Sequence, residues 1–124
     1  MSGRRFQPLN RVNDDRGAAT VLAAIMVAVL ITVTLAGVRL GSAVVARHRA
    51  QSVADLAALA GAARIPAGST AACREARALA DAMRATVQAC NVEQLDIAVS
   101  VAVAVGGWAG AQASARARAG PGES

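Results

Sequence analysis

The chain has 124 residues and a formal net charge of +5, and 55% of its residues are hydrophobic while 2% are aromatic. All 13 basic residues are arginine, and the excess of positive charge flanks one apolar run, where it can meet lipid phosphates. Because no aromatic platform accompanies these arginines, the composition argues against a nucleic-acid-binding module. The single membrane-length run leaves room for one small folded unit after it.

The first 17 residues are polar, contain Pro8 and show no apolar periodicity, so residues 1–17 are predicted to form a disordered tail. We expect this tail to be cytoplasmic and the C-terminal domain to be extracytoplasmic, because Cys73 and Cys90 both follow the apolar run and can be oxidised outside the cell. The arginine counts on the two flanks of the run are nearly equal, so the positive-inside rule does not by itself set the orientation.

Residues 18–38 form a run of 21 residues without a charged side chain. At about 1.5 Å per residue, a helix of this length crosses a hydrocarbon core of about 30 Å, and its ten Val, Leu and Ile residues favour insertion. We therefore predict a transmembrane helix over 18–38. Residues 39–63 are rich in alanine and contain no proline, so they are predicted to continue the same helix outside the membrane.

Small side chains recur along this helix at spacings that suit packing against another helix. Gly37 and Gly41 form a small-xxx-small pair that lets two helix backbones approach closely, and a low-volume apolar face follows over 44–61. The alternative, a thin helix that does not pair, stays open because such spacings are common in Ala- and Gly-rich helices. The residues assigned to helix packing are Gly37, Gly41, Gln51, Ala54, Asp55, Ala58 and Gly61.

A break at 64–68, which contains both proline and glycine, ends the long helix. Ser69 or Thr70 is expected to cap a second helix over 71–84. The apolar residues of this segment lie three and four positions apart, which is typical of a short amphipathic helix with a narrow contact surface.

Strict alternation of apolar with small or polar residues over 95–105 predicts a half-buried strand. A return strand is expected over 111–119, and a third, short strand over 86–90. The sequence thus predicts an α+β membrane protein, in which the long N-terminal transmembrane helix is followed by a short helix packed on a small antiparallel β-sheet. This outer domain is expected to span 69–119, with a frayed tail at 120–124.

Two alternatives are open for Cys73 and Cys90. If one helix ran straight through both, their sulfur atoms would be about 25 Å apart, which is too far for a bond. If the helix ends near Arg84 and the chain returns as a strand, the two cysteines come to the same end, and a disulfide there adds about 3 kcal/mol of stability. Otherwise they are two buried free thiols that behave as small hydrophobic side chains.

The sequence contains no arrangement typical of catalysis. The one histidine, His48, lies between Arg47 and Arg49, where a lone imidazole is typically solvent- or phosphate-facing. Two cysteines, one histidine and scattered carboxylates do not make a zinc set, and no glycine-rich loop is followed by Lys-Ser/Thr. We therefore predict that the protein is not an enzyme and has no metal, no cofactor and no small-molecule substrate.

Residues 16–63 carry a pattern that is known from one protein family. Arg16 and Gly17 lead into the apolar run, and the segment from Gln51 to Ala60 reads Gln-x-x-Ala-Asp-x-Ala-Ala-Leu-Ala. This pattern resembles the N-terminal module of TadE/TadG-like proteins, the pilin-like small membrane proteins of Tad (Flp) pilus assembly and secretion, in a high-GC bacterial branch. The resemblance implies a pilin-like helix whose partners are the lipid membrane and other Tad or pilin-like membrane proteins.

One position departs from this family pattern. Prepilin-like members are cut after the glycine that precedes the apolar run, so the resemblance implies a processing site between Gly17 and Ala18. Such members carry glutamate at the fifth position after the cut, where this chain has Leu22. In pilins this glutamate neutralises the new N-terminal amine of a neighbouring subunit in the fibre. Without it that amine would be a buried charge without a partner, which is costly. A membrane-resident minor pilin or assembly component therefore fits better than a major fibre subunit.

Two functions therefore remain open. The first is a non-enzymatic, pilin-like, single-pass component of the cell membrane that acts in a Tad/Flp-type pilus assembly or secretion system through lateral helix packing. The second is a secreted small α+β domain that signal peptidase releases and that binds an envelope ligand. The position of the mature N-terminus separates the two.

Overall fold

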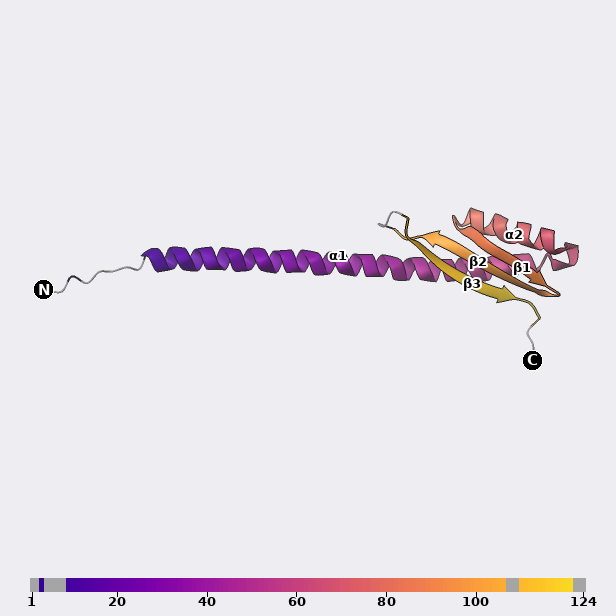
Figure 1. The fold of residues 1–124 in the computed structure, drawn as a ribbon, viewed down its shortest axis with the longest axis horizontal. Helices are drawn as coiled ribbons and strands as arrows, with labels where there is room; N and C mark the ends of the chain where they lie inside the picture. The colour runs from indigo at the N-terminus through magenta and orange to yellow at the C-terminus, as the bar shows by residue number, and fades with distance from the viewer. Residues whose placement is uncertain (1–2, 4–8, 107–109, 122–124) are drawn as a thin grey trace. The chain divides into compact units, whose positions relative to one another are not determined.

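The computed structural model describes residue 3 and residues 9–106 and 110–121, with the side chains of 9–13 left out of the description. The chain divides into two compact units, an N-terminal unit, Met1–Val38, and a C-terminal unit, Arg39–Ser124. Its elements, labelled in Figure 1, are α1 (Leu9–Ala62), the 3-10 helix η1 (Ile65–Ala67), α2 (Ser69–Ala82), β1 (Thr86–Glu93), β2 (Asp96–Ala104) and β3 (Gln112–Ala119). The predicted α+β class, with one long apolar helix, a second helix and an antiparallel sheet, is confirmed.

Helix α1 begins at Leu9, so the last part of the segment expected to be a disordered tail is helical. Residues 1–2 and 4–8 lie outside the described residues. Extending an existing helix adds a hydrogen bond for each residue, whereas starting a new one is costly. Between Pro8 and the apolar run, the sequence contains no further proline and one glycine, Gly17, and a single glycine costs about 1 kcal/mol.

The part of α1 in the N-terminal unit exposes its apolar side chains. Val21, Leu22 and Val33 are all about 60% exposed, and α1 is the one described helix that is long and apolar enough to cross a membrane. The hydroxyls of Thr32 and Thr34 donate to the carbonyl oxygens four residues earlier, each at 2.8 Å. These bonds satisfy the polar groups of the helix internally, as a segment surrounded by hydrocarbon requires.

The C-terminal unit is built on a three-stranded antiparallel sheet in the order β1-β2-β3. The central strand β2 buries every second side chain from Ile97 to Val103, and Ala102 is buried in addition. The strand pairs Ile97 with Val92 on one side and with Ala119 on the other. The sheet therefore has an apolar inner face and a polar outer face. The buried β2 residues of the inner face are Ile97, Val99, Val101 and Val103.

Both helices of the C-terminal unit cover the inner face of the sheet. Helix α2 contributes Ala72, Ala76 and Ala80 to the buried cluster, and Figure 1 shows α2 beside β1. The C-terminal part of α1 contributes a row of small residues at helical spacing. These are Ala50, Val53, Ala54, Ala57 and Ala58.

Several boundaries differ from the expected ones by a few residues, and two of these differences, at the start of α2 and at the end of β1, have a clear physical reason. Helix α2 starts at Ser69 with Gly68 as its N-cap, at φ 107°, and no side chain caps it, so the expected cap by Ser69 or Thr70 is wrong. Glycine takes this positive φ without strain, which lets the chain turn directly from η1 into α2. Strand β1 extends to Glu93, beyond the expected end at Cys90, because Val92 pairs with Ile97 and joins the apolar inner face.

Candidate functional site

Cys73 of α2 and Cys90 of β1 form a disulfide, with their Cα atoms 5.9 Å apart. Helix α2 ends at Ala82, and Arg84 takes φ 57°, so the chain reverses there and β1 returns along the helix. Cys90 pairs with Val99 at the inner face, where it packs against the buried cluster. Of the two alternatives that the sequence left open, the structure has the disulfide.

The residues assigned to helix packing divide into two groups. Ala54 and Ala58 are no more than 1% exposed, and Gly61 is also buried. An ideal Cβ on Gly61 would lie 2.5 Å from Ile97 Cδ1 and 3.1 Å from the carbonyl oxygen of Ala72. These three residues therefore pack inside their own C-terminal unit, where they are not accessible to a second chain.

We expect Gly61→Val to lower the free energy of unfolding of the C-terminal unit by about 1–3 kcal/mol, because overpacking a close helix–sheet contact forces side chains and backbone to shift. The measurement is hydrogen exchange of the β2 amides in the full chain in detergent. Gly41→Val is the matched control, since nothing lies within 4 Å of a Cβ built there. Equal β2 protection in the two variants would contradict the contact.

The second group lies on the exposed part of α1. Gly37 and Gly41 are exposed and have open space around an added Cβ. Gln51 Nε2 donates to Asp55 Oδ1 at 3.1 Å on the surface of the helix. Further along the same helix, exposed apolar side chains remain beside these polar residues, namely Val44, Val45, Leu56 and Leu59, which are 45–66% exposed.

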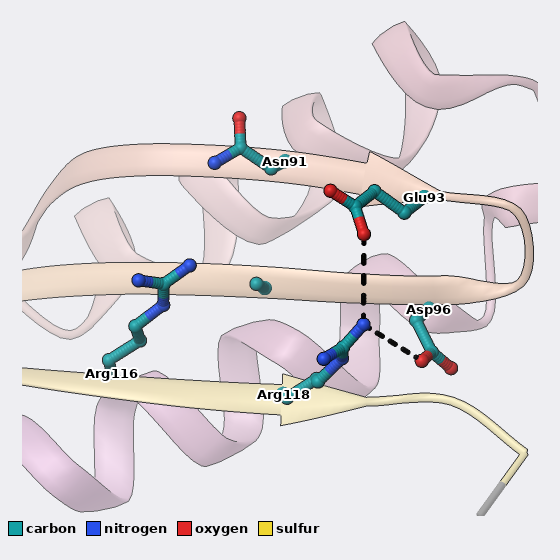
Figure 2. Close-up of a pocket in the computed structure, with 6 residues that line it drawn as sticks. Asn91, Glu93, Asp96, Arg116 and Arg118 are labelled. Atoms are coloured by element: carbon teal, nitrogen blue, oxygen red, sulfur yellow. Dashed lines mark ion pairs between the residues drawn. The ribbon is translucent and has the colours of Figure 1, made fainter. Parts of the chain in front are cut away.

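The outer face of the sheet carries an open polar hollow of about 360 Å³ above the small side chain of Ala98 (Figure 2). Arg118 lies between two carboxylates, with Nη2 3.2 Å from Asp96 Oδ2 and 3.8 Å from Glu93 Oε2. Exposed ion pairs of this kind contribute about 0–1 kcal/mol each. Because Arg118, Glu93 and Asp96 come from β3, β1 and β2, we infer that these ion pairs hold the ends of the three strands together. The sequence did not predict this cluster, because which side chains meet across β2 depends on the strand register.

His48 is exposed on α1, and its carbonyl oxygen accepts a hydrogen bond from Ser52 Oγ at 3.0 Å. Among the described residues, no group of three or more His, Cys, Asp or Glu side chains is placed to hold a metal ion.

These features define a small α+β unit that follows an N-terminal helix long and apolar enough to span a membrane. Residues 17–64 match the family model described as putative Flp pilus-assembly TadE/G-like, which confirms the resemblance inferred from the sequence over that segment. The matched segment begins at Gly17 and ends two residues after the last residue of α1, Ala62.

A curated relative is 57% identical to the chain over 53 residues, which are 43% of this chain and 63% of the relative. It is named apoptosis inhibitor Rv3654c and comes from Mycobacterium tuberculosis (strain ATCC 25618 / H37Rv). The chain thus spans less than two thirds of the length of this relative. No solved structure matches the chain.

The structure shows how the residues of the pattern from Gln51 to Ala60 are used in the fold. Its alanines at 54, 57 and 58 face the sheet and are buried, whereas Gln51 and Asp55 face outward and bond to each other. Alanine at the buried positions lets the helix lie close to the sheet. The most specific part of the motif therefore builds the C-terminal unit, in addition to any role in contacts between chains.

Proposed function

We propose that the protein is a non-enzymatic, pilin-like membrane component of a Tad/Flp-type pilus assembly or secretion system. The observation that supports this most directly is the match of residues 17–64 to the Flp pilus-assembly family, over the same helix that carries the apolar run. In the proposed arrangement α1 spans the cell membrane once, the N-terminus is cytoplasmic, and the C-terminal unit is extracytoplasmic. The Cys73–Cys90 disulfide supports that side, because disulfides persist in oxidising compartments.

Lateral helix packing is the proposed mode of action, and the structure narrows the residues that are available for it. Ala54, Ala58 and Gly61 are occupied within the chain, so contacts with neighbouring helices fall to other parts of α1. The open small-xxx-small pair Gly37 and Gly41 is suited to close approach of two backbones within or at the edge of the membrane.

The position of the mature N-terminus tests this proposal. Mass spectrometry of the protein purified from the membrane fraction is expected to give an N-terminus at Met1, or at Ala18 if the bond after Gly17 is cut. Either result keeps α1 in the membrane. Recovery of the protein mainly from the soluble fraction, without the apolar run, would contradict the proposal.

A helix this apolar near an N-terminus also has the properties of a secretion signal, so the secreted-domain alternative is a defined outcome of the same measurement. The structure sets a limit on it. Ala46 and Ala50 are 5% and 0% exposed and help to cover the sheet, so release of a folded unit requires cleavage between Val38 and Ala46. A mature N-terminus in that interval supports the alternative.

A further inference from the structure

One end of the C-terminal unit combines three exposed arginines, two from α1 and one from the turn between α2 and β1. Arg49 of α1 donates from Nη2 to the carbonyl oxygen of Met83 at 2.9 Å, which joins α1 to the C-terminal end of α2. Arg84 follows Met83 in the chain, and Arg47 is exposed two residues before Arg49, on another side of α1 but at nearly the same level along the helix axis. We call Arg47, Arg49 and Arg84 the basic end. None of the three forms an ion pair among the described residues.

The strand order places the basic end at the end of the sheet where β1 begins and β2 ends. Strand β1 begins at Thr86, directly after Arg84, and Thr86 pairs with Ala102 near the end of β2. Ala104 pairs with Gln112 at the start of β3. The connection between β2 and β3 therefore lies at the same end of the unit as Arg49 and Arg84.

The opposite end of the unit holds three of the unit's five described carboxylates, and these three are paired. Arg64 lies 3.9 Å from Glu75, and Arg118 bridges Glu93 and Asp96. Near the basic end, Asp81 is the carboxylate of the last turn of α2, and Asp55 is held by Gln51 further along α1. The basic end therefore carries three arginines against one nearby carboxylate, Asp81, which leaves it with a net positive charge.

We propose that the basic end binds the phosphates of anionic lipid headgroups, so that the C-terminal unit rests on the membrane surface. This inference rests on the proposed insertion of residues 18–38. Arg39 then marks the edge of the hydrocarbon, and Arg47 and Arg49 lie about 12 and 15 Å further along the helix axis.

These distances fall within the reach of lipid charge. The headgroup layer of one leaflet is about 5–8 Å thick, and the Debye length at physiological ionic strength is about 8 Å. The guanidinium groups at the basic end are thus inside the region where a negative surface attracts them. Arginine is suited to this partner because its planar fork donates two hydrogen bonds to one phosphate.

The chain supplies its own reporter for this contact. Its one tryptophan, Trp108, lies outside the described residues, but it belongs to the β2–β3 connection, whose described flanks, Gly106 and Gly110, are at the basic end. Quenching of its fluorescence by lipids with brominated acyl chains reports how close this end of the unit comes to the membrane.

The experiment compares the full-length chain in vesicles of phosphatidylcholine alone and in vesicles that also contain phosphatidylglycerol, both with brominated phosphatidylcholine. We expect quenching of Trp108 to increase with phosphatidylglycerol and to lose this increase in high salt. Arg47→Gln/Arg84→Gln is expected to lose the same increase. Arg49 is left intact in this variant, because it also bonds to Met83.

The matched control is Arg74→Gln/Arg116→Gln, which removes two exposed arginines away from the basic end and is expected to keep the increase. Quenching that is the same in both kinds of vesicle, or that falls equally in the two double variants, would overturn the inference. Flotation of the chain with vesicles in alkaline carbonate is measured in the same samples. A chain that floats but shows no lipid-dependent quenching disproves only this inference, whereas a chain that does not float disproves the proposed membrane insertion.

Discussion

Replacing both cysteines in Cys73→Ala/Cys90→Ala is expected to lower the free energy of unfolding of the C-terminal unit by about 3 kcal/mol. The bond closes a loop with a sequence separation of 17, and a crosslink of this size restricts the unfolded chain by about that amount. The loss corresponds to about a hundredfold more frequent opening. Hydrogen exchange of the β2 amides in the full chain in detergent measures it.

Two controls accompany the disulfide experiment. Reduction of the unaltered protein is expected to reproduce the exchange of the double variant, and the reductant is expected to change nothing in the variant itself. Exchange in residues 18–38 serves as an internal reference, because the N-terminal unit contains neither cysteine. Unchanged β2 protection after loss of the bond would show that the disulfide does not stabilise the fold.

The second large effect is expected for Ile97→Ala, which should cost about 3–4 kcal/mol. Ile97 is the largest of the fully buried side chains and is 0% exposed. Its Cδ1 atom fills the space next to Gly61 of α1. Removing buried methyl and methylene groups loses their transfer free energy and leaves a cavity, which together cost about 2–5 kcal/mol.

Leu95→Ala provides the matched control two residues away. Leu95 is 61% exposed at the turn between β1 and β2, so its truncation is expected to change stability by no more than about 0.5 kcal/mol. The same exchange measurement reports both variants. A loss for Ile97→Ala as small as that for Leu95→Ala would contradict the buried position of Ile97, and a large loss for both would show that Leu95 is buried as well.

The sheet was the most predictable part of the fold. The alternation in β2 is strict because one face is covered by helices and the other is not, so its expected range of 95–105 differs from Asp96–Ala104 by one residue at each end. Strand β3, Gln112–Ala119, begins one residue after the start of the predicted range of 111–119. The pairing of the cysteines also depended on one topological fact, the reversal of the chain after α2, which Arg84 makes at positive φ.

The use of the small residues on α1 was less predictable. The sequence pattern at Ala54, Ala58 and Gly61 indicated a close contact, but alanine and glycine suit contact with a second chain as well as with the chain's own sheet. Side-chain volume therefore gave no basis for choosing between the two. The polar hollow around Arg118 was out of reach for a different reason, since its members come from three strands and meet only in the final register.

The buried core of the C-terminal unit consists mainly of alanine. Alanine supplies nine of the 14 residues of its buried cluster, and an alanine methyl group has no rotamer to change and no rotamer entropy to lose on folding. Ordering these alanines therefore costs little, but their methyl groups cannot turn to fill a vacancy or make way for an added atom. Any adjustment of the packing to a change in shape is left to the five branched side chains of the cluster, one isoleucine and four valines.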